Sequence, residues 1–183
     1  MTSNRVKSQM GMTIEEFGKK CHDLLKAEPG APGRAKVRDL LKEVLMDDEF
    51  IASHFGPDNT DPRKCLYEDP DLKFCIFAHV HTGAKDSPPH DHGPSWAIYG
   101  QADGKTVMND WDLVSRPEDG KPGKVKLNKQ YEMKRGDAHM YDVGQFHSPH
   151  RSGPTKLIRI EGQNLDFVKR DRYEAVEGAA AAE

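Results

Sequence analysis

The feature that most constrains the fold is the sequence pattern from Lys73 onward. Short apolar and aromatic segments alternate there with turns rich in glycine, proline and aspartate. Many short segments with regular turn signals are typical of a β-sandwich or a closed β-barrel. The turn RPEDGKPGK, residues 116–124, is expected to be an exposed hairpin loop. The expected strands are KFCIFAHVH, SWAIYGQ, KTVMNDWDLV, KVKLNKQYEMK, AHMYDVG, TKLIRIEG and LDFVKR.

The first third of the chain has a helical pattern. Thr13 and Glu16 form a capping box, and apolar residues recur at helical spacing after it. EPGAPG, residues 28–33, is expected to end this helix, and a second helix should run from about Arg34. A third helical segment, DDEFIASHFG, is expected to end at Gly56.

These patterns predict one domain that is mainly β. We expect residues 1–57 to form a helical segment that packs on a barrel, residues 58–172 to form the barrel itself, and residues 173–183 to be a flexible tail.

Composition excludes several classes of function. The chain has 183 residues, a formal net charge of −3 and no basic block of the kind that binds nucleic acid. No apolar run approaches the roughly 20 residues that span a bilayer, and the N-terminus lacks the apolar core of a signal peptide. Cys21, Cys65 and Cys75 are widely spaced, which indicates reduced thiols. We expect a cytoplasmic monomer or homodimer that binds a small molecule, and neither nucleic acid nor membrane.

Two histidines stand two residues apart in SPPHDHGPSWAIYG, residues 87–100. In an extended segment residues i and i+2 point to the same side, so His90 and His92 can reach one ion together. Two ligands are not enough, and GDAHMYDVGQFHSPH offers His147 just after a glycine-containing turn.

The spacing around these histidines resembles the first of the two motifs of the cupin superfamily. That motif is a glycine, a short gap, HxH, a few residues, usually a glutamate, six residues and a second glycine. The chain has Gly83, His90, His92, Ala97 and Gly104, so the first gap is one residue longer and Ala97 replaces the glutamate.

The second cupin motif is G-x5-P-x-G-x2-H-x3-N. Here Gly136, Gly144 and His147 keep their spacing, Asp142 replaces the proline and Arg151 replaces the asparagine. The resemblance implies a cupin jelly-roll barrel with a helical N-terminal layer. It also implies a metal site of three histidines that lacks the usual glutamate.

A three-histidine site has open positions for substrate or dioxygen. Neutral imidazoles leave the metal ion its full charge, which favours an anionic chelating substrate. Fe(II) is the expected metal, and Zn, Ni, Mn or Cu are also compatible with imidazole ligands.

Residues 73–112, from KFCIFAHVH to NDWD, resemble the corresponding stretch of cysteine dioxygenase and other thiol dioxygenases, and the similarity extends over roughly residues 60–165. Those enzymes are Fe(II) cupins that insert both atoms of O2 into a thiol sulfur. The resemblance implies that His90, His92 and His147 are metal ligands. It also sets Arg63 near the arginine that binds the substrate carboxylate.

The sequence departs from that family at the residues that tune its oxygen chemistry. Ala97 occupies the place of the cysteine that forms a crosslink to a tyrosine. Leu157, Arg159 and Glu161 replace the family's serine, histidine and tyrosine on a late strand. Cysteine is therefore expected to be a poor substrate.

Strand parity puts Leu157, Arg159 and Glu161 on one face, and the resemblance points that face into the barrel. Charged groups there are costly unless they are paired, so Arg159 and Glu161 either satisfy each other or have a function. In the functional alternative Glu161 is a general base or substrate anchor, and Arg159 or Arg63 binds an anion.

Phe77, His79 and His81 share a face of the strand at residues 73–81, and the alignment points this face into the same cavity. His79 and His81 are therefore further candidates for substrate contact, and Tyr99 is another candidate. His79 and His81 form a second HxH without an evident third ligand, and His150 is a candidate to orient His147.

Three functions remain open from the sequence. The first is an Fe(II)-dependent cupin dioxygenase, similar to the thiol dioxygenases, that acts on a small polar or anionic substrate with O2. The second is another metal-dependent cupin enzyme, such as a lyase or isomerase, in which Glu161 moves protons. The third is a cupin without catalytic activity that binds a metal or small ligand. Fold alone does not separate them.

Overall fold

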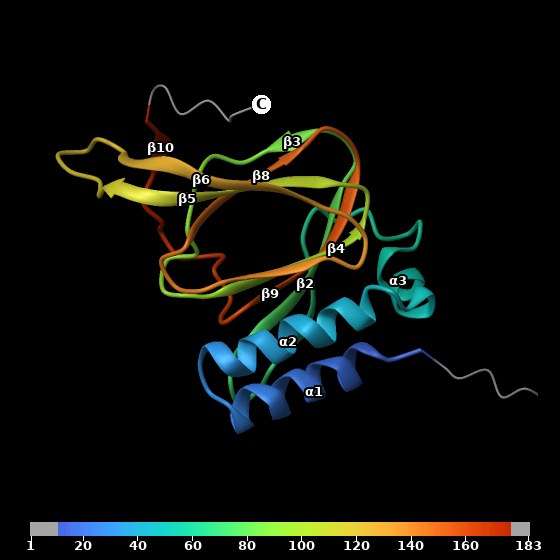
Figure 1. Cartoon of the computed structure of the whole chain (residues 1–183). Coiled ribbons are helices and arrows are strands. Elements are labelled where there is room, and N and C mark those ends of the chain that lie inside the picture. The colour runs from blue at the N-terminus through green and yellow to red at the C-terminus, as the bar shows by residue number, and fades with distance from the viewer. Residues whose placement is uncertain (1–10, 177–183) are drawn as a thin grey trace, which may run out of the picture.

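The computed structural model describes residues 11–176, in which three helices precede ten strands (Figure 1). The helices are α1 (Ile14–Ala27), α2 (Ala31–Val44) and α3 (Asp48–Phe55). The strands are β1 (Lys64–Glu68), β2 (Cys75–His81), β3 (Lys85–Asp86), β4 (Ala97–Asp103), β5 (Thr106–Ser115), β6 (Gly123–Met133), β7 (Ala138–Tyr141), β8 (Phe146–Arg151), β9 (Thr155–Glu161) and β10 (Tyr173–Ala175).

The strands form two five-stranded sheets that curl against each other (Figure 1). One sheet has the order β1-β2-β9-β4-β7, and the other has the order β10-β6-β5-β8-β3. Neighbouring strands are antiparallel except for β10, which is parallel to β6. The predicted fold class, a mainly β jelly-roll barrel with an N-terminal helical layer, is confirmed.

The helices begin and end close to the predicted residues. The capping box of Thr13 and Glu16 is present, and Asp47 caps α3. Helix α2 begins at Ala31, earlier than predicted, because Pro32 lies in its first turn, where a proline removes no helical hydrogen bond. Within residues 11–176, no helix combines the length and the apolar character that crossing a membrane requires.

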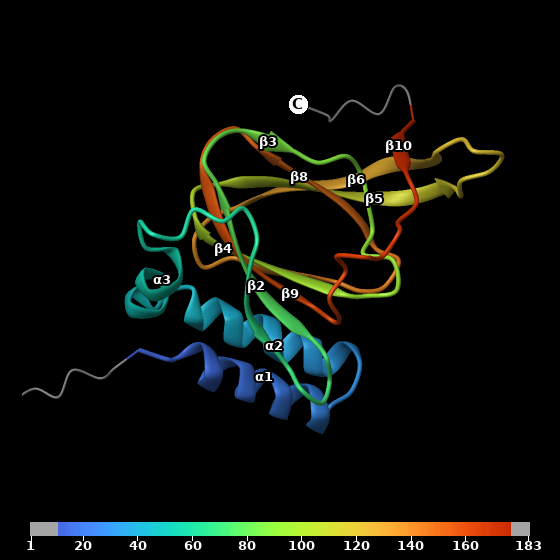
Figure 2. The ribbon, with the colours of Figure 1, turned by 180° about the vertical axis from the view of Figure 1, so that it is seen from behind.

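The helices cover the outer face of the β1-β2-β9-β4-β7 sheet, as Figure 2 shows from behind. Residues of one parity on the central strands point to the helices: Ile76, Ile98, Ile158 and Ile160 are fully buried against them. Residues of the other parity therefore point into the barrel, where the candidate site lies.

At the ends of the barrel the observed strands differ from those predicted from the sequence. LDFVKR is not a strand: no neighbouring strand pairs with it, and Phe167 within it is fully exposed. Strands β1, β3 and β8 were not predicted. Tyr173–Ala175 was assigned to the flexible tail but forms β10, because its backbone pairs with β6 from Gly123 to Val125. The rest of the predicted tail, residues 177–183, lies outside the described residues.

Gly100, on β4, packs against the C-terminal end of α2. A Cβ atom at this position would lie 2.6 Å from Leu41 Cδ2 and 2.9 Å from Leu45 Cδ1. We predict that Gly100→Ala lowers the free energy of unfolding by about 1–3 kcal/mol, because it overpacks the layer between helix and sheet. Gly83→Ala is the control, since its Cβ would meet nothing within 4 Å. Urea denaturation measures both variants, and equal stability would contradict this account of the packing.

Candidate metal centre

Three imidazoles meet inside the barrel. His90 and His92 come from the loop before β4, and His147 comes from β8 in the opposite sheet. One ring nitrogen from each residue lies within 4.8 Å of the other two. Among residues 11–176, these side chains form the one group of histidines, cysteines and carboxylates that is close enough to hold a metal ion.

Backbone hydrogen bonds fix two of these residues relative to each other. The N–H of His90 donates to the carbonyl of His147, the N–H of His147 donates to the carbonyl of His90, and both distances are 3.0 Å. His90 Nδ1 lies 2.8 Å from the Pro88 carbonyl oxygen, which can only accept, so Nδ1 carries the proton. The lone pair of the neutral ring is then on Nε2, and the Pro-Pro turn sets its orientation.

All three imidazoles are neutral near pH 7. Burial lowers the pKa of His90 to about 4 and that of His92 to about 2. Burial, followed by the charges of His90 and His92, holds the pKa of His147 well below its usual range. Each ring therefore offers a lone pair without first losing a proton.

The donor set fits a divalent transition metal ion. His92 Nε2 and His147 Nε2 are 3.3 Å apart, and the Tyr99 hydroxyl lies 3.2 Å from His92 Nε2. Neutral imidazole nitrogens that converge in this way are typical ligands of Fe, Zn, Cu and Ni. The three histidines can thus hold a metal ion, and their chemistry does not identify which one.

Glu161 lies behind His92 and does not face the point where the three rings converge. Its Oε1 is 3.6 Å from His92 Nδ1, on the side of the ring opposite Nε2. The carboxylate is almost fully buried and forms ion pairs with Arg159 Nε at 2.8 Å and Arg63 Nη2 at 3.3 Å. The Arg159 Nε–H does not point at the oxygen, so this contact is an ion pair without a good hydrogen bond. The expected parity is observed, and so is the pairing of Arg159 with Glu161.

Arg63 is engaged by carboxylates on both arms of its guanidinium. Nη1 pairs with Asp166, Nη2 pairs with Glu161, and the group lies over the Phe77 ring at 3.7 Å. The residue that the alignment suggested as a carboxylate binder therefore holds two of the protein's own carboxylates.

A cavity of about 900 Å³ opens beside His90. The sequence-predicted contact residues Arg63, His79, His81, Tyr99 and Arg159 all line it. His79 Nδ1 donates to the Pro62 carbonyl at 3.0 Å, and its buried Nε2 has no hydrogen-bond partner among the described residues. His79 Nε2 is therefore a hydrogen-bond acceptor without a partner on the side of the cavity formed by β2.

Four further cations that were not predicted from the sequence also line this cavity: Lys85, Arg151, Arg170 and Arg172. Arg151 was noticed only as a replacement within the second motif. Because Arg151 lies four residues after His147 on an extended segment, alternation would have predicted that both point to the same side.

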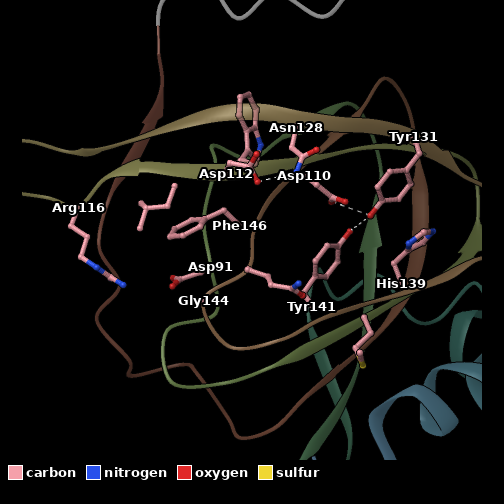
Figure 3. Close-up of a pocket in the computed structure, with 14 residues that line it drawn as sticks. Asp91, Asp110, Asp112, Arg116, Asn128, Tyr131, His139, Tyr141, Gly144 and Phe146 are labelled. Atoms are coloured by element: carbon pink, nitrogen blue, oxygen red, sulfur yellow. Dashed lines mark hydrogen bonds between the residues drawn. The ribbon is translucent and has the colours of Figure 1, made fainter. Parts of the chain in front are cut away.

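A smaller cavity of about 400 Å³ lies beside Tyr141 (Figure 3). Tyr141 lines it and stacks on the His147 ring, with 3.9 Å between ring centroids. In Figure 3 the Tyr131 hydroxyl lies between the Tyr141 hydroxyl and Asp110. It donates a hydrogen bond to the Asp110 carboxylate at 3.1 Å. Tyr141 therefore separates this cavity from the metal ligand.

The second HxH pair and His150 do not take the roles in metal binding that were considered from the sequence. His79 and His81 line the large cavity, but within the described part of the chain no third ligand joins them. His150, the candidate to orient His147, is half-exposed and pairs with Asp86 at 2.6 Å on the outer face of β8.

No family model and no curated protein matches the sequence. Among solved structures, the chain is similar to a cupin superfamily protein from Desulfitobacterium hafniense, with 13% identity over 56% of this chain and 76% of that one and a TM-score of 0.40. It is also similar to KdgF from Halomonas sp., with 14% identity, coverage of 59% and 86%, and a TM-score of 0.42. A Klebsiella pneumoniae protein with a double-stranded β-helix domain has 15% identity, coverage of 61% and 80%, and a TM-score of 0.42. At this level of similarity no function follows from these proteins.

Burial of neutral histidines makes the stability of the metal-free protein depend on pH. Burial lowers the pKa of His79 to about 2. Below about pH 6.5 the unfolded chain takes up a proton at this position that the folded chain does not, so stability falls as the pH falls. We predict that His79→Asn, which can still donate to Pro62, makes the decline between pH 6.5 and 4.5 shallower by up to roughly 1.4 kcal/mol per pH unit. Denaturation of both proteins over this pH range measures the two slopes, and identical slopes would contradict the effect of burial.

Proposed function

We propose that this chain is a metal-dependent cupin dioxygenase, similar to the thiol dioxygenases, that acts on a small anionic substrate with O2. The observation that carries the proposal is the position of the three imidazoles. They converge within 4.8 Å of one another, and one of them, His90, lines a cavity that is rich in arginine. An anion in that cavity would lie next to the open side of the metal site.

The resident metal in this proposal is Fe(II). A bound Fe(II) ion supplies the redox chemistry that couples O2 to the substrate, whereas Zn, Ni, Mn and Cu are also compatible with three imidazoles. The residues that would hold the ion are His90, His92 and His147. Because their pKa values are low, the site is ready to bind metal without a change in pH.

The protein's own residues position the ligands and the substrate. Glu161 Oε1 lies 3.6 Å from His92 Nδ1, too far for a hydrogen bond, but its negative charge favours the tautomer with the proton on Nδ1 and leaves the lone pair of Nε2 for the metal. Arg63 and Arg159 neutralise Glu161 and hold it there. The Tyr99 hydroxyl can turn from His92 to a substrate atom, and His79 Nε2 can accept from a protic group of the substrate.

The substrate is expected to differ from cysteine. Ala97 stands next to Glu161 in the sheet and cannot supply the family's crosslink, and Arg159 lines the cavity in place of the family's histidine. The resemblance to thiol dioxygenases supports the type of metal site, and the charge of the cavity supports an anionic substrate.

A lyase or isomerase that uses Glu161 as a general base is less favoured. A general base must reach the proton it abstracts within hydrogen-bond distance or through one water. Glu161 contacts the far side of His92 and is held by two arginines, so it is better suited to orienting His92.

Metal and oxygen measurements test the proposal. We predict that protein purified without added metal contains a transition metal ion, and that His147→Ala loses most of it while keeping its circular dichroism spectrum. His150→Ala, on the outer face of the same strand, should retain the metal.

The Fe(II)-loaded protein should consume O2 with small anionic thiols, and it should do so faster than with cysteine. Full metal occupancy in His147→Ala, measured by mass spectrometry, would contradict the site.

Glu161 provides a second prediction. Glu161→Gln keeps the shape of the side chain but removes the charge that attracts His92 Nδ1–H, so metal affinity should fall by about 10- to 100-fold. Competition with a chelator measures this affinity. Asp166→Asn removes the other carboxylate partner of Arg63 without touching His92 and is the matched control. Unchanged metal affinity together with a lost turnover would instead assign Glu161 to proton transfer.

A further inference from the structure

The cavity beside the three histidines carries an excess of positive charge. Two acidic side chains, Asp171 and Glu174, line it, and Glu174 pairs with Lys124 at 3.0 Å. Six cationic side chains also line it: Arg63, Lys85, Arg151, Arg159, Arg170 and Arg172. Arg63 pairs with Glu161 and Asp166, and Arg159 pairs with Glu161. The other four cations form no ion pair within residues 11–176.

Arg151 is the unusual member of this set because it is buried. Its exposed fraction is 4%, and its Nε has no hydrogen-bond partner among the described residues. Lys85, Arg170 and Arg172 are exposed, so water solvates them at the rim. A buried guanidinium without a counter-charge is costly, and such groups are usually paired. Burial lowers the pKa of Arg151, and the charge of Arg159 acts in the same direction, whereas Tyr99 and Asp86 act in the opposite direction without an ion pair to Arg151.

Arg159 and Arg151 approach the cavity from opposite sheets. Arg159 lies on β9, with its guanidinium carbon 5.7 Å from the centre of the Tyr99 ring, and Arg151 lies on β8. Arg159 already has a protein carboxylate, Glu161, but shares it with Arg63. One ligand anion would therefore neutralise one of the two inner arginines and leave the other short of negative charge.

We propose that the cavity binds a small molecule with two anionic groups, one held by Arg151 and the other by Arg159. The inference rests on the proposed function, since this molecule would be the substrate of the same site. The group on Arg151 is a carboxylate or a phosphate, because the guanidinium fork binds either one with two parallel hydrogen bonds. The exposed cations at the rim attract such a dianion from solution.

Calorimetric titration of the full chain at constant ionic strength tests the proposal with two matched pairs of probes. Succinate is compared with propionate, and 2-phosphoglycolate is compared with glycolate. Each dianion should bind at least about tenfold more tightly than its monoanion, because a second charge-assisted contact forms. Tighter binding of succinate identifies a second carboxylate, and tighter binding of 2-phosphoglycolate identifies a phosphate.

Variants at Arg151 assign the second contact. Arg151→Met should weaken dianion binding by about ten- to hundredfold and leave monoanion binding nearly unchanged. Arg151→Lys keeps the charge without the fork and should be intermediate, so the comparison stands even if the methionine variant folds poorly. Arg38→Met is the control, because Arg38 lies on α2 and pairs with Asp39 at 2.9 Å.

Equal affinity for the dianion and the monoanion in the unsubstituted protein would overturn the proposal. So would unweakened dianion binding in both Arg151 variants. Metal content is measured on the same samples. If the protein binds dianions selectively but fails to bind metal, the proposed function is refuted and this inference stands. If the protein binds metal but does not prefer dianions, only this inference is refuted.

Discussion

The reciprocal backbone hydrogen bonds between His90 and His147 are the contact on which the site depends. They join the loop that carries His90 and His92 to β8 in the opposite sheet, so ligands 55 or more residues apart in the chain meet at one point. Backbone bonds fix the Cα positions, and the Pro88 carbonyl then fixes the ring of His90. A site built in this way is preorganised by the barrel and does not need the metal to assemble it.

Strand β9 connects the two halves of the architecture. Its even-numbered residues, Ile158 and Ile160, are buried under the helices, and its odd-numbered residues, Arg159 and Glu161, face the barrel interior. Alternation along one strand therefore assigns one face to stability and the other to chemistry. The helical layer supports the site indirectly, since it buries the apolar face and holds the central sheet in place.

Much of the fold and part of the site followed from periodicity. The helices, most long strands, the HxH geometry and the inward face of β9 are all local patterns. Strand β8 was missed because FHSPHR contains Pro149 and no β-branched residue, which hides its strand character. Parity predicted that Glu161 points inward, but it could not predict which side of His92 the carboxylate touches. That depends on the register of β9 against β2 and β4, which no local pattern specifies.

The distribution of charge explains why the polar interior is tolerated. Within residues 11–176, Glu161 contacts Arg63, Arg159 and the candidate metal ligand His92, so it balances positive charge on two sides at once. A metal ion bound by three neutral imidazoles would add further positive charge close to Arg159. The protein's own acidic groups near the cavity are already paired or exposed, so the additional negative charge has to come from a ligand. The same imbalance that makes the empty cavity costly thus favours the binding of an anion beside the metal site, where the chemistry of the proposed reaction would take place.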